Sequence, residues 1–175
     1  ARIHTACTIT RNQLIKAGIE PAKIKVIPLG INREIFRPTT ELFRSKLREQ
    51  LGVRPGSFVI GSFQKDGVGW GEGNEPKLIK GPDIFLKVIE RLAKKHKLHV
   101  LLTGPSRGYV KQGLVELRVP FTHIPYAQDA TAIAKYYHAL DLYLISARVE
   151  GGPMAILEAW ATGVPVVATR VGMIA

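Results

Sequence analysis

The sequence predicts an α/β fold in which a doubly wound parallel sheet carries helices on both faces. Five apolar runs alternate with segments of helical periodicity, and none of these runs shows the polar alternation of a half-exposed strand. The chain has 175 residues, 46% of them apolar, which is enough for one core of ordinary size. No internal repeat or low-complexity tract interrupts the pattern.

The elements follow one another in regular order. Strands are expected at 57–63, 98–104, 119–126, 141–146 and 164–169. Helices are expected between them, at 109–117, 129–140 and 153–163 and from Pro82 onward, where apolar residues recur every three or four positions. Before this unit we expect a strand at 3–10, a short helix ended by Gly18, an extended segment at 23–30, and a helix capped by Thr39 or Thr40 and ended by Gly52.

Ligands of such sheets bind outside the carboxyl ends of the strands. The loops after Phe63, Thr103, Pro125, Ser146 and Thr169 are therefore the places to look for a site. The glycine-rich stretch 64–81 is the only long loop without expected structure, and loops of that length are usually functional or mobile.

Charge and composition narrow the function classes. The formal net charge is +11, which attracts nucleic acid, anionic lipid or phosphorylated small molecules. The basic runs 44–48 and 94–97 are interpreted as solvated helix faces and ends. The single cysteine, Cys7, suits a reducing cytoplasm, and no apolar run approaches the roughly 18 residues that span a bilayer.

The stretch EGGPMAILE at 150–158 carries the most chemistry. Gly151 and Gly152 let the backbone turn or approach a ligand closely, and Pro153 suits the first position of a helix. The amides of Met154 and Ala155 would then be free to bind an anion, with the helix dipole adding to the attraction.

Two carboxylates flank this anion site. Glu150 follows the strand 141–146 by a few residues, and Glu158 lies one turn into the helix with its side chain leaning back toward the helix start. A diphosphate bound by the amides and two polyhydroxy groups bound by the acids would satisfy every part. This combination describes a nucleotide sugar.

The sequence also resembles a known family. EGGPMAILEAWATGVPVVAT is similar to the signature of retaining GT-B glycosyltransferases of family 4, in which seven residues separate two glutamates. KIKVIPLGINREIFRP, LIKGPDIFLKVIERL and YYHALDLYLIS resemble, in order, the segment leading into the C-terminal domain, its Lys-Gly element, and the helix and strand before the first glutamate. Together these elements cover nearly the whole chain.

The resemblance implies roles for individual residues. Glu150 would contact the transferred sugar and Lys80 would stabilise the departing diphosphate, which makes these two the candidate catalytic residues. Glu158 would bind the donor ribose, and Tyr126 would lie where the base binds. The remaining candidate donor-binding residues are Gly61, Ser62, Lys65, Gly104, Gly151, Gly152, Met154 and Ala155.

The sequence departs from the family pattern near the first strand of the sheet. Ser62 follows Gly61 where the family usually has an arginine, and Lys65 is a candidate replacement for that cation. The following loop inserts many residues before Lys80, so the sequence leaves the arrangement of Lys65 and Lys80 open. Trp70 in this loop could equally touch a ligand or cover the loop.

The resemblance also implies a domain organisation. Residues 1–39 would form a lead-in segment from an N-terminal domain and linker, and residues 40–175 a Rossmann-like donor-binding domain without its last elements. The chain alone is expected to be inactive, because the acceptor would be bound by the N-terminal domain of the same polypeptide. No cofactor or metal is expected, the acceptor would be a glycan or lipid-linked, and the protein would be cytoplasmic, with peripheral association at the inner face of the membrane left open.

Two other functions fit parts of the sequence. A non-catalytic nucleotide-sugar-binding module would share the fold, and Ser62 in place of arginine favours it. A basic nucleic-acid-binding protein would explain the charge, but it leaves Glu150 and Glu158 without a role, and aromatic residues do not interleave with the basic ones. We therefore do not expect a nucleic-acid partner.

Overall fold

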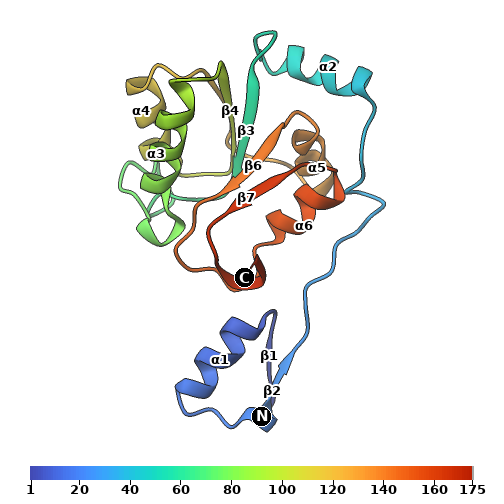
Figure 1. The fold of residues 1–175 in the computed structure, drawn as a ribbon, viewed down its shortest axis with the longest axis vertical. Helices are drawn as coiled ribbons and strands as arrows, with labels where there is room; N and C mark the ends of the chain where they lie inside the picture. Colours follow the sequence, from blue (N-terminus) through green and yellow to red (C-terminus); the bar gives the residue numbers. More distant parts are fainter. Residues whose placement is uncertain (175) are drawn as a thin grey trace.

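The computed structural model describes residues 1–174 and contains two parallel sheets. The larger sheet has five strands in the order β5-β4-β3-β6-β7 (Figure 1). Its strands are β3 (Phe58–Phe63), β4 (Leu98–Thr103), β5 (Phe121–Ile124), β6 (Leu142–Ile145) and β7 (Val166–Ala168). The order starts in the middle at β3 and proceeds outward on either side, which confirms the predicted doubly wound parallel sheet.

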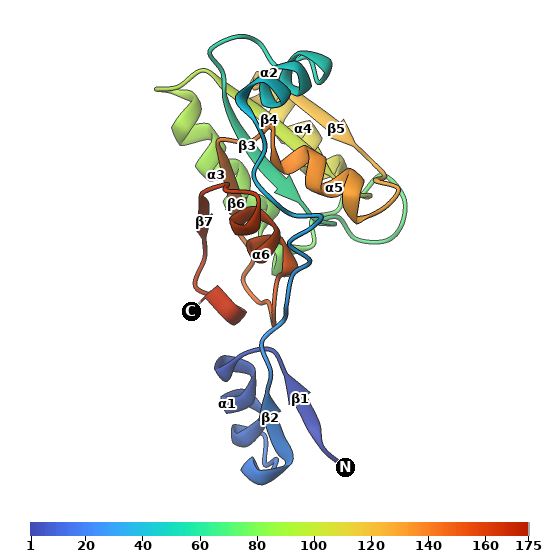
Figure 2. The ribbon, with the colours of Figure 1, turned by 90° about the vertical axis from the view of Figure 1, so that its right-hand side faces the viewer.

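Helices cover both faces of this sheet, as the continuous apolar strands predict. They are α2 (Glu41–Gln50), α3 (Pro82–Ala93), α4 (Gly108–Glu116), α5 (Ala130–Tyr137) and α6 (Met154–Ala161). Helices α3 and α4 lie on one face, and α5 and α6 lie on the other (Figures 1 and 2). Alternate residues of one strand enter different cores: Val59 of β3 packs with the α5 and α6 side chains, and Ile60 with those of α3 and α4.

A small unit precedes the larger sheet. Strand β1 (Ile3–Thr5) pairs in parallel with β2 (Ile24–Val26), and α1 (Thr8–Lys16) and a 3₁₀ turn (Pro21–Lys23) connect them. Figures 1 and 2 show this unit at one end of the molecule, joined to α2 by a long extended segment. It approaches the start of α6, where a Cβ on Gly152 would lie 2.9 Å from the Cβ of Ala6.

The prediction of a strand over 3–10 was wrong beyond Thr5. The Thr5 hydroxyl donates to the Cys7 carbonyl at 2.7 Å, Cys7 caps α1 with an extended backbone, and Thr8 already lies in the helix. The β-branched residues of this run favour a strand locally, so contacts at the turn decide the outcome. Of the two predicted cap residues, Thr39 and Thr40, the structure selects Thr40, whose side chain accepts the Phe43 amide at 3.3 Å.

The prediction that 64–81 lacks structure was also wrong. An isolated antiparallel bridge joins Gly67 and Pro76, and a 3₁₀ turn spans Leu78–Lys80. The Lys77 amide donates to the Asp66 carbonyl at 2.8 Å, which closes the base of the loop. A final 3₁₀ turn spans Gly172–Ile174. Within the described residues, no helix combines the length and the apolar character needed to cross a membrane.

Candidate functional site

Two adjoining pockets open at the carboxyl edge of the large sheet. The first, here called the inner pocket, has a volume of about 290 Å³ and is lined by Lys80, Glu150, Met154, Ala155 and Glu158, together with residues of β3 and β6. The second, here called the outer pocket, has a volume of about 320 Å³. Phe63, Gln64 and Glu158 line both pockets, so the two form one cleft. The cleft lies where a doubly wound sheet is expected to bind its ligand.

Lys80 and Glu150 form an ion pair in the inner pocket, although they lie 70 positions apart. Arg148 joins the loop after β6, which carries Glu150, to the segment around Lys80. Its guanidinium donates to both carboxylate oxygens of Asp83 at 2.8 and 2.7 Å and to the Leu78 carbonyl at 2.6 Å. The Arg148 amide also donates to the Ile79 carbonyl at 2.9 Å. Hydrogen bonds from Arg148 hold the pKa of the Asp83 carboxyl below its ordinary value. The loop after β6 is therefore tied to the start of α3.

Lys80 keeps donors available for a ligand in this arrangement. An ammonium has three donors, and Glu150 accepts one of them. The backbone of Lys80 is fixed separately, since its carbonyl accepts from the Gln64 side chain at 3.3 Å and from Ser146 Oγ at 3.4 Å. Glu150 therefore orients the Lys80 ammonium in the inner pocket, and the remaining N–H donors can bind the oxygens of an anion such as a phosphate.

The start of α6 supplies a second electropositive group, the free backbone amides of its first residues. Pro153 is the N-cap with an extended backbone, so the prediction that it is the first helical residue was one position too early. Met154 and Ala155 open the helix, and within residues 1–174 no protein acceptor bonds to their amides. Both residues line the inner pocket. Free amides at a helix start, beside a lysine, form an arrangement that binds anions.

Glu158 lies between the two pockets. Its Oε2 accepts the hydroxyl of Tyr137 at 2.8 Å, and Tyr137 packs edge-on against Phe63 in the cleft floor, with ring centroids 4.8 Å apart. Burial raises the pKa of the Glu158 carboxyl above its ordinary value of 4.5, although the Tyr137 hydrogen bond lowers it. Burial also raises the pKa of Tyr137 well above 10.0, so this hydroxyl remains a neutral donor. Tyr137 fixes one oxygen of Glu158 and leaves the other for a ligand.

The outer pocket holds the other predicted residues. Lys65, Gly104 and Tyr126 line it, and the Tyr126 side chain is 81% exposed. The Lys65 ammonium lies 3.6 Å from the ring centroid of Trp70. The structure therefore places Lys65 and Lys80 in different pockets of one cleft.

Four predicted residues do not line either pocket. Gly61 lies inside β3, where a Cβ would overlap the Leu140 side chain, and Ser62 is buried beneath the cleft. Gly151 is exposed, with open space beside it, and Gly152 packs against Ala6 and Leu29.

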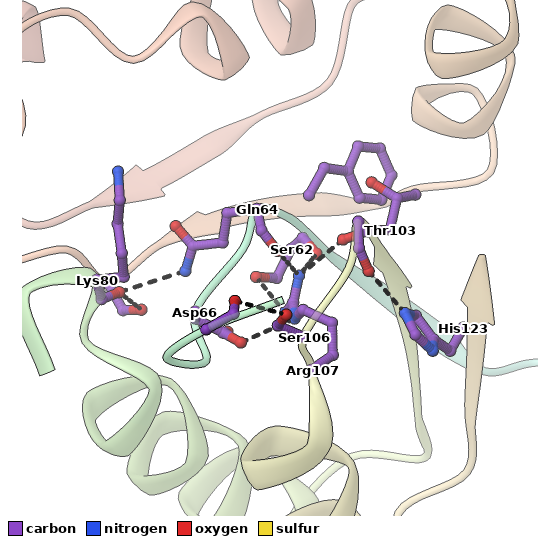
Figure 3. A network of polar contacts seen from close by, with 12 residues as sticks. Ser62, Gln64, Asp66, Lys80, Thr103, Ser106, Arg107 and His123 are labelled. Carbon is purple, nitrogen blue, oxygen red and sulfur yellow. Dashed lines mark hydrogen bonds and ion pairs between the residues drawn. The ribbon is translucent and has the colours of Figure 1, made fainter. Parts of the chain in front are cut away.

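Sequence reasoning missed Tyr137, Gln64 and Arg107. Tyr137 belongs to the YYHAL run, but its contact with Glu158 spans 21 positions. Arg107 lies under the cleft floor and bonds to Ser62, Gln64 and Thr103 (Figure 3). No sequence pattern in TGPSRGYV marks Arg107 as a buried residue.

Two further features bear on the choice of site. A larger pocket, about 990 Å³, lies between the segment 34–43 and α5, away from the free helix amides and from Lys80. Within the described residues, no group of three or more His, Cys, Asp or Glu side chains is arranged to hold a metal ion.

Sequence comparison assigns the family. A profile described as "Glycosyl transferases group 1" matches residues 72–175. The chain belongs to this family. A D-inositol 3-phosphate glycosyltransferase of Mycobacterium marinum is 32% identical over 87% of the chain, and a lipopolysaccharide core biosynthesis mannosyltransferase, LpsB, of Rhizobium meliloti is 29% identical over 84%. The chain spans only 31% and 40% of the lengths of these two relatives.

Solved structures of this class have the same fold. Anabaena HepE, crystallised with UDP and glucose, superposes with a TM-score of 0.75 and 26% identity over 98% of the chain and 45% of HepE. HepE has also been crystallised with UDP-glucose. WaaG, a glycosyltransferase of lipopolysaccharide biosynthesis, superposes with a TM-score of 0.74 at 19% identity, which shows the fold alone. The chain therefore has the fold of a GT-B glycosyltransferase C-terminal domain.

The pH dependence of the melting temperature should show that the Glu158 carboxyl is buried. The folded carboxyl binds its proton more tightly than the unfolded one, because burial raises its pKa above 4.5. Its contribution to stability is therefore lost as pH rises from 4.5 through the folded pKa. Glu158→Gln removes this titration, so the melting temperature of the variant minus that of wild type is expected to increase from acidic to neutral pH. A difference that stays constant with pH would contradict the assigned burial.

Proposed function

We propose that the chain is the donor-binding domain of a glycosyltransferase that uses a nucleotide diphosphate sugar. The enzyme would transfer a hexose to a glycan or lipid-linked acceptor with retention of configuration, as in family 4 of the GT-B enzymes. Family membership and the likeness to HepE, which binds UDP and UDP-glucose, support the donor class. The observation that carries the proposal is the inner pocket, where Lys80, Glu150 and Glu158 meet the free amides of α6.

Each part of the cleft has a proposed role toward the donor. The diphosphate binds between the Lys80 ammonium and the amides of Met154 and Ala155, which stabilise the charge that develops on the leaving group. Glu150, next to Lys80, accepts hydroxyl groups of the hexose. The ribose binds to the free oxygen of Glu158, and the base lies in the outer pocket toward Tyr126. The two pockets share Glu158, which matches the linear order of sugar, diphosphate and nucleoside.

The positive charge at the diphosphate would come from the protein. Lys80 and the start of α6 supply it in this proposal, so no metal ion or other cofactor is required for donor binding. The acceptor would be held by an N-terminal domain of the same polypeptide, across the cleft from this domain. The net charge of +11 suits peripheral association with an anionic membrane that presents a lipid-linked acceptor.

Titration of nucleotide sugars tests the proposal. UDP-glucose and GDP-mannose are titrated into wild type by calorimetry, and the tighter donor is then titrated into Glu158→Ala. We expect the affinity of the variant to fall about tenfold or more, because a charge-assisted hydrogen bond to the ribose is lost. Glu90→Ala, which removes an exposed acid of α3, serves as the matched control and should bind as wild type does. Equal affinities of wild type and Glu158→Ala would contradict the ribose assignment.

A non-catalytic nucleotide-sugar-binding module is the second candidate. Ser62, where the family usually has an arginine, is buried and bonded to Arg107, so this position presents no cation to the inner pocket. Such a module would bind the donor as proposed but would not cleave it. Donor hydrolysis or transfer by the complete polypeptide, followed by release of the nucleoside diphosphate, distinguishes the enzyme from the module.

A further inference from the structure

Arg107 connects the carboxyl ends of β3 and β4 directly beneath the cleft. Its Nη1 donates to the carbonyls of Ser62, Gln64 and Thr103 at 2.8, 2.6 and 2.9 Å, and its Nη2 donates to Ser62 Oγ at 3.0 Å (Figure 3). The β3–β4 pairing ends at Phe63 and Thr103. The guanidinium therefore continues the connection between the strands past the end of their ladder, where Gln64 and Thr103 line the outer pocket.

Asp66 neutralises this buried guanidinium. Arg107 is 1% exposed and Asp66 is fully buried, and Arg107 Nε lies 3.0 Å from Asp66 Oδ1. The contact is an ion pair without the alignment of a hydrogen bond. Because the charges of the pair cancel, its effect on the cleft comes through position and not through net charge. Asp66 is also the first residue of the inserted loop, so the pair ties this loop to both strands.

The inserted loop, residues 66–77, is docked against the start of α4. Ser106 Oγ donates to the carbonyls of Gly69 and Gly71 at 3.1 and 2.9 Å. The first amides of α4 are occupied by the loop as well, since Gly108 donates to the Glu72 carbonyl at 2.6 Å and Tyr109 to the Gly73 carbonyl at 2.9 Å. A Cβ on Gly67 or Gly73 would overlap the Ser106 backbone, so only glycine permits this approach at those two positions.

The docked loop places Trp70 against Lys65, which lines the outer pocket. The Trp70 side chain is 85% exposed, so burial of its ring does not explain its place in the loop. Its ring face holds the ammonium of Lys65, which lines the outer pocket with Tyr126 and Glu158. A tryptophan face is the preferred aromatic partner of a cation, and the contact restricts an otherwise flexible side chain.

We infer that Arg107 is a positioning residue for donor binding, which holds Gln64 and, through the docked loop, the Lys65–Trp70 pair at the nucleoside end of the cleft. The inference rests on the proposed function, and it assigns the inserted loop to the donor site as a fixed wall. Lys65 and Trp70 contact the nucleoside part of the ligand, whereas Lys80 contacts the diphosphate.

Affinity and stability measured together test this role. UDP and GDP are titrated into wild type, and the tighter ligand is titrated into Arg107→Lys and Trp70→Ala well below their melting temperatures. Arg107→Lys keeps the charge but replaces a planar fork of five donors by one ammonium on a shorter side chain, which cannot serve the three carbonyls, Ser62 Oγ and Asp66 together. The dissociation constant is therefore expected to rise about tenfold, the lower end of the range found when residues that orient a metal ligand are removed. Trp70→Ala is expected to raise it severalfold without lowering the melting temperature, because the ring is exposed.

Arg44→Lys is the matched control. Arg44 donates to the Leu140 carbonyl at 3.1 Å and pairs with Asp141, which precedes β6 at the opposite edge of the sheet. This variant should lose stability and keep wild-type affinity. If Arg107→Lys behaves in the same way, or does not fold while Trp70→Ala binds as wild type does, the positioning role is wrong. If wild type binds neither UDP nor GDP, the proposed function itself fails, which is a different result.

Discussion

Arg107→Met is expected to lower the free energy of unfolding by about 3–5 kcal/mol, the range found when one partner of a buried ion pair is removed. The substitution leaves Asp66 buried without its counterion and deprives three carbonyls of their donor. Leaving a buried acceptor or charge without its partner destabilises the folded state by more than the original interaction stabilised it. Urea unfolding followed by circular dichroism measures the change.

Two comparisons sharpen this test. Arg44→Met removes a partly exposed ion pair and is expected to cost less than Arg107→Met, since partly solvated pairs contribute little. A double variant with Asp66→Leu and Arg107→Met removes both buried charges and should recover part of the lost stability. A loss of less than about 1 kcal/mol for Arg107→Met would mean that the pair contributes no more than a surface pair does.

Lys80→Ala is expected to weaken binding of a nucleoside diphosphate by roughly 2–5 kcal/mol, because it removes one partner of a desolvated charge contact. The effect is increased by Glu150, which loses its cation and then faces the diphosphate with unopposed negative charge. Calorimetric titration of UDP or GDP, whichever binds wild type, measures the loss.

The matched nucleoside and a neighbouring lysine are the controls. Uridine or guanosine lacks the diphosphate, so its affinity should change little in Lys80→Ala. Lys77→Ala removes an exposed cation three positions earlier and should leave diphosphate binding as in wild type. Equal weakening of nucleoside and diphosphate would place Lys80 outside the phosphate contact.

Local patterns predicted most of the fold. Runs such as 98–104 have no polar alternation, and a strand buried on both faces requires this composition. The helix cap at Thr40 also followed from local chemistry. The run 3–10 misled because β-branched residues favour a strand, whereas the Thr5–Cys7 turn starts a helix at Thr8.

The site was predictable where it consists of short-range chemistry. The Gly-Gly-Pro turn, the helix start and Glu158 lie within nine residues. Of these, Pro153, the helix start and Glu158 line the inner pocket together with Lys80, whereas the two glycines do not. The supporting contacts span much longer distances in sequence: Arg148 reaches Asp83 across 65 positions, and Arg107 reaches Ser62 across 45. In sequence, Asp66 and Arg107 both fall in expected loops, outside the predicted strands and helices. Only the tertiary fold buries them together.

A crystal structure of the protein with UDP or GDP tests the central claim most directly. The account predicts that the diphosphate lies in the inner pocket, within hydrogen-bonding distance of the Lys80 ammonium and of the amides of Met154 and Ala155. The ribose hydroxyls should then contact Glu158, with the base in the outer pocket. A nucleotide bound elsewhere, for example between α5 and the segment 34–43 with the Lys80–Glu150 pair and the helix amides untouched, would contradict the account.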